Sequence, residues 1–82
     1  MKYPFTISIT RKPGLSDPEG TTTKKALHDL GFRGVTHVSY GRTISVEVTA
    51  GTAQEAAADV QAMCEKLLAN PVIETYTIEA MP

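Results

Sequence analysis

Three stretches of this sequence alternate apolar and polar residues with the two-residue period of a β-strand that buries one face. They lie within residues 3–9, 43–50 and 72–81. The apolar members of the second stretch are Ile44, Val46, Val48 and Ala50. A helix does not accommodate this pattern, because its faces repeat about every 3.6 residues. The chain is therefore predicted to build a sheet with one buried and one polar face.

A fourth β-prone run lies at residues 35–40, directly before the second alternating stretch. Only Gly41 and Arg42 separate the two runs, and a glycine in the first of two loop positions favours a type II′ turn. The sequence therefore predicts a β-hairpin that turns at these two residues.

A first helix is predicted between the first two strands. Asp17 can cap its start, and Pro18 suits the first helical position. Gly31 can take the left-handed conformation that ends a helix, which lets Phe32 fold back on Leu27. The residues of its predicted buried face are Thr23, Ala26, Leu27 and Leu30.

A second helix is predicted between the last two strands. It begins with a capping box formed by Thr52 and Glu55, followed by an apolar stripe at helical spacing over residues 53–68. Asn70 is predicted to take a left-handed cap, and Pro71 forbids a further turn.

The order strand, helix, strand, strand, helix, strand predicts an α+β fold of the ferredoxin-like βαββαβ type. In this fold a four-stranded antiparallel sheet carries two helices on one face, and the single domain spans residues 1–82. The uncovered face could be exposed to solvent or could stack on another sheet through its small hydroxyl side chains. Exposure to solvent is favoured, because burying a hydroxyl group without a partner costs about 1 to 3 kcal/mol. Its residues are Thr6, Ser8, Thr10, Ser45, Glu47, Thr49, Thr75, Thr77 and Glu79.

The composition excludes several classes of function. Eight Lys and Arg against nine Asp and Glu give a net charge of −1, so no basic field attracts nucleic acid or anionic lipid. Apolar runs stay far below the roughly 20 residues that cross a bilayer. One cysteine and no signal-peptide pattern predict a cytoplasmic protein.

Residues with catalytic or metal-binding chemistry are few and scattered. His28 and His37 stand alone, without a Cys or carboxylate at ligand spacing. Cys64 falls on the apolar stripe of the second helix, where burial disfavours the reactive thiolate. The glycines form neither a GxGxxG motif nor a Walker loop. We therefore predict no catalytic and no metal-binding residue.

Three segments together resemble the PurS family: KPGLSDPEG (12–20), ALHDLGF (26–32) and CEKLLANPVIETY (64–76). PurS chains are small subunits of phosphoribosylformylglycinamidine synthase, and the likeness extends along essentially the whole chain. The third segment is the most specific, because a leucine pair followed by ANPVIE and an aromatic residue seldom arises by chance.

The resemblance implies a non-catalytic subunit in purine biosynthesis that bridges two larger chains. These would be a PurL-like synthetase, which uses ATP and Mg²⁺, and a PurQ-like glutaminase, which supplies ammonia. The resemblance also implies a homodimer or homotetramer and no cofactor in this chain. Two alternatives of similar topology stay open: a stand-alone ACT-like domain that senses amino acids, and an acylphosphatase-like hydrolase with less support.

The resemblance also implies candidate residues for partner binding. Asp17, Pro18, Asn70 and Pro71 are also explained as helix caps. Arg42 and Glu74 are preferred, because charged residues at turns and strand starts are seldom needed for folding. The sequence departs from the family at Glu19, where glutamine is more common. The candidates are Pro13, Gly14, Asp17, Arg42, Asn70, Glu74 and Tyr76.

Overall fold

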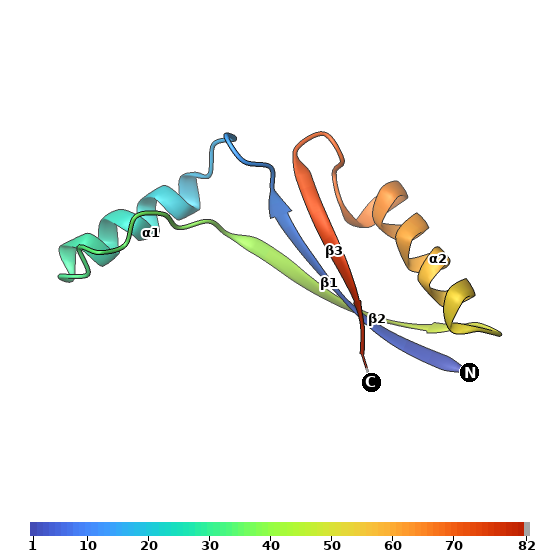
Figure 1. Cartoon of the computed structure of the whole chain (residues 1–82). Coiled ribbons are helices and arrows are strands. Elements are labelled where there is room, and N and C mark those ends of the chain that lie inside the picture. The colour runs from blue at the N-terminus through green and yellow to red at the C-terminus, as the bar shows by residue number, and fades with distance from the viewer. Residues whose placement is uncertain (82) are drawn as a thin grey trace.

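A computed structural model describes residues 1–81 and contains three strands, two α-helices and one π-helical turn (Figure 1). The elements in chain order are β1 (Lys2–Arg11), α1 (Pro18–Asp29), β2 (Gly41–Thr49), α2 (Ala53–Met63), η1 (Cys64–Leu68) and β3 (Glu74–Ala80).

The three strands form one antiparallel sheet in the order β2-β1-β3. β1 lies in the centre, with Ile7 opposite Ile44 of β2 on one side and Ile78 of β3 on the other. The alternating stretches of the sequence therefore correspond to the three strands, and their apolar residues share one face of the sheet.

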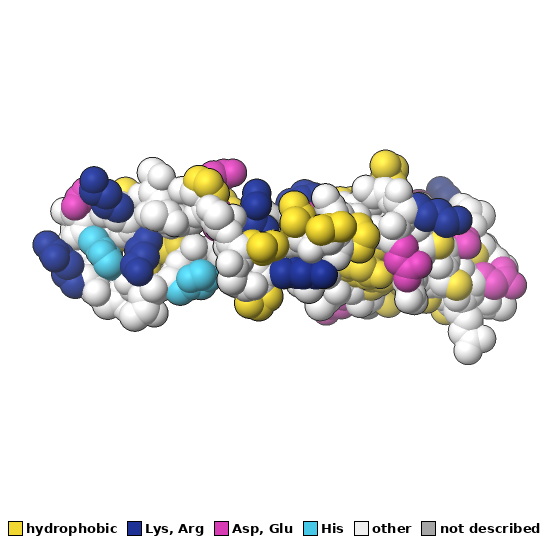
Figure 2. Space-filling view, turned by 90° about the horizontal axis from the view of Figure 1, so that it is seen from above, with side chains coloured by type: hydrophobic (Ala, Val, Ile, Leu, Met, Phe, Trp, Pro, Cys, Tyr) yellow, Lys and Arg dark blue, Asp and Glu magenta, His cyan; other side chains and the backbone are white. Residues whose placement is uncertain are grey.

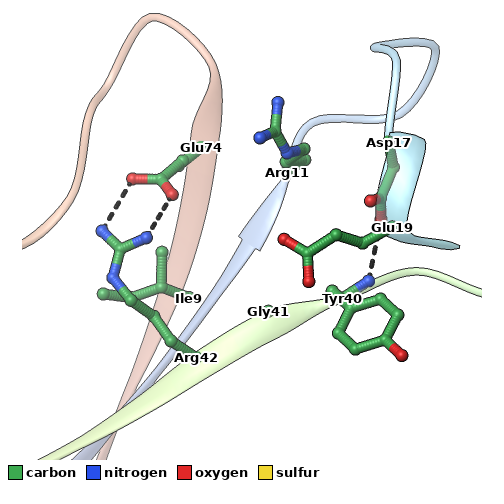
Figure 3. A pocket seen from close by; sticks show the side chains of 8 residues that line it. All are labelled: Ile9, Arg11, Asp17, Glu19, Tyr40, Gly41, Arg42 and Glu74. Atoms are coloured by element: carbon green, nitrogen blue, oxygen red, sulfur yellow. Dashed lines mark hydrogen bonds and ion pairs between the residues drawn. The ribbon is translucent and has the colours of Figure 1, made fainter.

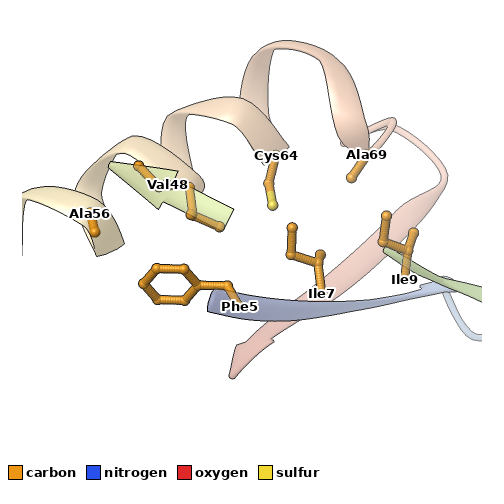
Figure 4. Close-up of a cluster of buried hydrophobic side chains, with 8 residues drawn as sticks. Phe5, Ile7, Ile9, Val48, Ala56, Cys64 and Ala69 are labelled. Atoms are coloured by element: carbon orange, nitrogen blue, oxygen red, sulfur yellow. The ribbon is translucent and has the colours of Figure 1, made fainter. Parts of the chain in front are cut away.

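The core lies between this apolar face and α2 (Figure 4). Phe5, Ile7 and Ile9 of β1 point toward Val60 and Cys64, and all five side chains are buried. The two-residue period of β1 and the helical period of α2 thus meet in one apolar layer. The predicted burial of Cys64 is confirmed.

The end of α2 differs from the prediction. The N–H of Ala69 donates to the carbonyl of Cys64 at 3.1 Å, which closes the wide π-helical turn of η1. Asn70 does not take a left-handed cap, because within residues 1–81 only glycines have positive φ. Its side-chain Oδ1 instead accepts the N–H of Val72 at 3.0 Å, so the residue reverses the chain through an Asx turn.

Both ends of α1 follow the prediction. Asp17 caps the first turn and Pro18 occupies the first helical position. Gly31 has φ +104°, its N–H donates to the carbonyl of His28, and the next N–H, of Phe32, donates to that of Leu27. This pair of hydrogen bonds is the Schellman ending that a glycine permits.

The predicted four-stranded sheet is wrong, because residues 35–40 form no strand and no turn occurs at Gly41 and Arg42. Gly41 already pairs with Thr10 of β1, so β2 begins where the turn was expected. The preceding residue, Tyr40, is held by α1, since its N–H donates to the Asp17 carboxylate at 2.8 Å. Residues 35–40 therefore run back along α1 and not along β2 (Figure 1).

The predicted placement of both helices on one face of the sheet is also wrong. α2 lies along the sheet, whereas α1 extends away from the end of it (Figure 1). We call residues 18–40 the arm and the remainder the body. Within α1 only Gly20 is buried, so the predicted apolar face of this helix has no sheet beneath it.

Candidate functional site

The arm and the body meet at a junction where β1 ends and where β2 and β3 begin. The junction holds a cleft of about 170 Å³ between the two parts (Figure 3). The residues that line it come from all three strands, from α1 and from the residue before β2: Ile9, Arg11, Asp17, Glu19, Tyr40, Gly41, Arg42 and Glu74. Three of these are among the residues predicted to bind partners.

Arg42 and Glu74 form a bidentate ion pair on the body side of the cleft (Figure 3). Arg42 Nη1 lies 2.6 Å from Glu74 Oε2, and Nη2 lies 3.0 Å from Oε1. The same Nη2 donates to the carbonyl of Leu68 at 2.8 Å. The pair links the start of β2 to the start of β3 and to the end of η1, so both residues have a structural role.

This pairing shifts the pKa values of both groups in the directions expected for an ion pair. The Arg42 guanidinium, helped by the N–H of Asn70, holds the pKa of Glu74 below its ordinary value. Hydrogen bonding to Glu74 raises the pKa of Arg42. The Arg42 side chain is still half exposed, so it remains accessible to a partner.

Asn70 supports the ion pair through its backbone. Its N–H donates to Glu74 Oε1 at 2.8 Å, and its carbonyl accepts the N–H of Glu74 at 2.8 Å. With the Asx turn to Val72, these bonds fix the path from η1 into β3. Asn70 therefore sets where the Glu74 carboxylate lies.

Asp17 is the matching residue on the arm side of the cleft. Its Oδ2 accepts the N–H of Tyr40 at 2.8 Å, and its Oδ1 accepts the N–H of Gly20 at 3.0 Å. These N–H groups, Tyr40 first, lower the pKa of the carboxyl. About one helical turn further along, a hydrogen bond of 2.6 Å between the hydroxyls of Thr23 and Tyr40 joins α1 to the residue before β2.

Pro13 and Gly14 line a neighbouring recess of about 350 Å³ that shares Arg11 and Asp17 with the cleft. Gly14 has φ +85°, a conformation that a residue with a side chain seldom adopts. The glycine therefore turns the chain out of β1 and toward α1.

Tyr76 lies apart from both recesses. It pairs with Ile9 across the sheet and packs half-buried against the core. Burial raises the pKa of its phenol.

Sequence reasoning missed Arg11 and Tyr40 as parts of the junction. It also missed the role of Gly20, although a glycine in the first turn of a helix was a usable signal. A Cβ at this position would collide with the carbonyl oxygen of Val38, so glycine lets residues 35–40 approach α1.

The groups that could react are held in unreactive settings. Burial raises the pKa of the Cys64 thiol, which keeps it protonated. The His28 ring is engaged through Nε2 with the carbonyl of Val35 at 2.7 Å. Within residues 1–81, no three His, Cys, Asp or Glu side chains gather as a metal ion requires. The junction can thus act through charge, hydrogen bonds and shape.

The helices of residues 1–81 include none with both the length and the apolar character to cross a bilayer.

Comparisons with known proteins agree along almost the full chain. The family model described as PurS, phosphoribosylformylglycinamidine (FGAM) synthase, matches residues 4–82. The phosphoribosylformylglycinamidine synthase subunit PurS of Archaeoglobus fulgidus is 46% identical over 72 residues, which cover 88% of this chain and 90% of that subunit.

Solved structures show the same fold. Methanocaldococcus jannaschii PurS, one of the subunits of formylglycinamide ribonucleotide amidotransferase in the purine biosynthetic pathway, matches with a TM-score of 0.83 and 38% identity over 96% of this chain and 95% of that one. A chain in the structure of PurLQS from Thermotoga maritima matches with a TM-score of 0.91 and 30% identity over 99% of both chains.

Proposed function

The chain belongs to the PurS family, and from this membership we propose that it is the small, non-catalytic subunit of a phosphoribosylformylglycinamidine synthase in purine biosynthesis. The observation that carries the proposal is the family match over residues 4–82, together with a fold shared over 99% of the chain. Residues 1–82 would act as one functional domain.

The proposed partners are a PurL-like synthetase and a PurQ-like glutaminase. A chain of the same fold belongs to the PurLQS structure from Thermotoga maritima, which supports this assignment. ATP and Mg²⁺ would be used by the synthetase, and ammonia released from glutamine would pass between the two larger subunits. The assembly would work in the cytoplasm, where the free thiol of Cys64 stays reduced.

The shape of the chain supports a bridging role. It measures 52 × 27 × 13 Å, so nearly every residue lies close to a surface and little volume is left for an enclosed active site. Its one thiol, that of Cys64, is buried in the core. Such a chain offers other proteins a large contact area for its size.

The junction is the proposed contact region for the larger subunits. Arg42 and Glu74 present a charged pair there, and Pro13 and Gly14 form a turn beside it. The N–H of Asn70 holds Glu74 in place, and Asp17 holds Tyr40 on the arm side of the cleft. Tyr76, two residues along β3 from Glu74, lines neither recess and would contribute only if the partner extends from the junction along β3.

Reconstitution of the enzyme tests the proposed function. The synthetase and glutaminase subunits are purified and assayed for glutamine-dependent amidation with and without this chain. We expect turnover with glutamine to require the chain, whereas turnover with added ammonia requires only the synthetase. Glutamine-dependent activity that is the same with and without this chain would refute the proposal.

The junction is tested with a matched pair of variants. Arg42→Gln removes one half of the junction ion pair, and Lys2→Gln removes one half of the exposed pair between Lys2 and Glu47, which lies far from the junction. We expect only Arg42→Gln to weaken binding to the larger subunits, measured by calorimetry on samples that circular dichroism shows to be folded. Equal binding by both variants would remove Arg42 from the contact region.

A further inference from the structure

The recess beside the cleft lies between the body and the arm. It encloses about 350 Å³, which is within the range of small-molecule sites. One part of its lining comes from the end of β1 and the loop after it and carries Arg11 and Lys12. His37 and Ser39 come from the arm, and Asp17 lines the recess at the start of α1. The recess therefore combines two basic side chains with a carboxylate, an imidazole and a hydroxyl group.

The two basic side chains of the recess have no ion-pair partner in the described part of the chain. Within residues 1–81 the ion pairs involve Lys2 and Arg42, and no carboxylate lies within ion-pair distance of Arg11 or Lys12. Arg11 donates one side-chain hydrogen bond there, of 3.3 Å from Nη1 to the carbonyl of Ser16, which leaves most of its five N–H groups available. Figure 3 shows its guanidinium standing apart from the ion pair on the body side of the cleft. The recess therefore offers positive charge to a ligand.

The backbone that carries these two side chains is held by the sheet. Arg11 is the last residue of β1 and pairs with Glu74 of β3. The N–H of Lys12 donates to the carbonyl of Ile73 at 2.8 Å, and the carbonyl of Lys12 accepts the N–H of Leu15 at 3.4 Å. Because the backbone of both basic residues is fixed before a ligand arrives, binding costs less conformational entropy.

The charge of the chain is unevenly distributed, and the recess lies in its basic part. Residues 11–40 hold five Lys and Arg against three Asp and Glu, which gives +2, whereas the other residues hold three against six, which gives −3. Seen from above, basic and histidine side chains gather over the arm and the junction (Figure 2). The field near the recess therefore attracts anions, although the whole chain carries −1.

The other polar groups of the recess suit hydroxyl groups of a ligand. Asp17 accepts two N–H groups, and a carboxylate has about four acceptor positions, so it can accept further hydrogen bonds. His37 and Ser39 are exposed, and within residues 1–81 their side chains make no hydrogen bond, whereas the ring of His28 is bound to the carbonyl of Val35. Asp17 repels a bare anion, so the ligand that fits best presents hydroxyl groups to it and its own charge elsewhere.

We propose that the recess binds a small phosphorylated sugar. Its phosphoryl group lies at Arg11 and Lys12, where a forked guanidinium and an ammonium group match a dianion. Its hydroxyl groups lie at Asp17, His37 and Ser39. An acidic protein side chain fits less well, because it brings one charge and no hydroxyl groups. Inorganic phosphate shares only the anionic part of this chemistry, so the two ligands can be told apart by their affinities.

Titration of the full chain with ribose 5-phosphate, followed by NMR, tests the site. We expect amide signals within residues 11–17 and 37–39 to shift. The dissociation constant should be about tenfold lower than that of inorganic phosphate, because phosphate lacks the hydroxyl contacts. Neutral ribose should leave the signals in place. Unchanged signals in these residues with ribose 5-phosphate would overturn the inference, and so would equal affinity for the two anions, which would mean an adventitious ion only.

A matched pair of lysine variants locates the phosphoryl group. Lys12→Gln removes a charge from the recess, whereas Lys66→Gln removes one from η1, outside the recess. We expect only Lys12→Gln to raise the dissociation constant of ribose 5-phosphate, by about tenfold, because it removes a charge-assisted contact. Equal affinities of the two variants, which circular dichroism must show to be folded, would overturn the inference.

Ser39→Ala separates the sugar from the phosphoryl group. We expect this variant to bind ribose 5-phosphate several-fold more weakly and inorganic phosphate as the parent chain does. Equal weakening of both ligands would contradict the placement of the sugar. These titrations use the chain without the larger subunits, so their failure leaves the proposed function intact. The reconstituted amidation assay shows separately whether the chain serves the enzyme.

Discussion

At the residue scale, the ion pair of Arg42 and Glu74 shows why a surface charge can be structural. Isolated pairs on a surface contribute little, because solvent and salt screen them. Here Glu74 is largely covered and accepts a further N–H from Asn70, while Arg42 also donates to a backbone carbonyl. The pair therefore holds three chain segments in register at the junction.

The Glu74 pKa predicts how stability depends on pH. The folded pKa lies below the ordinary value of 4.5, so the unfolded chain binds more protons in acid. The stabilisation is complete above pH 4.5 and is lost as the pH falls through the folded pKa. We expect the urea midpoint of the chain to fall more steeply between neutral and acid pH than that of Glu74→Gln. Parallel curves would contradict this role, since Asp17 titrates in both proteins.

Cys64 gives a second prediction at this scale. Cys64→Ala removes a fully buried side chain from the core and should lower the free energy of unfolding by about 1 kcal/mol. Glutamine-dependent turnover of the reconstituted enzyme should be unchanged. Cys64→Ser places a hydroxyl in the same apolar setting and should cost more stability. Lost turnover in a complex that still assembles would show that the thiol has a function beyond packing.

Residues whose roles are decided within a few positions were predictable from the sequence. The caps at Asp17, Thr52 and Gly31 depend on neighbours in the same turn, and the structure confirms them. Asn70 has two local options, a left-handed cap and an Asx turn, and the sequence does not distinguish them. The choice follows from the hydrogen bond between its N–H and Glu74, which the structure alone reveals.

At the scale of elements, the error concerned where residues 35–40 pair. These residues do favour strands, and Gly41 and Arg42 favour a turn. Both preferences compete with contacts between residues 35–40 and the start of α1, which is more than ten residues away in sequence. Tyr40 is bound by Asp17 and Thr23, and Gly20 admits Val38. A single sequence does not rank these contacts against a hairpin. The sheet was therefore predicted with one strand too many.

The close contact at Gly20 yields a prediction for the arm. Gly20→Ala would place a Cβ against the carbonyl of Val38 and near the Asp17 carboxylate, so residues 35–40 should detach from α1. We expect faster amide hydrogen exchange for Tyr40 and for the last turns of α1, with the body unchanged. Gly34→Ala is the matched control, because a Cβ there meets open space. Equal exchange in the two variants would show that the arm does not depend on this contact.

At the scale of the whole molecule, stability should depend on whether copies of the chain associate. The body has a small core built on one face of three strands, and the arm has almost none. If copies of the chain associate, as the resemblance to PurS implies, unfolding is coupled to dissociation, and mass action raises the melting temperature with concentration. A monomer of this fold would melt at the same temperature at every concentration.

Thermal unfolding over a hundredfold range of concentration measures this coupling. The free energy of a dimer changes by about 2.7 kcal/mol over that range, which corresponds to roughly 5 to 10 °C for two chains of this length. A melting temperature that is constant over the range would show that each copy folds without a second copy.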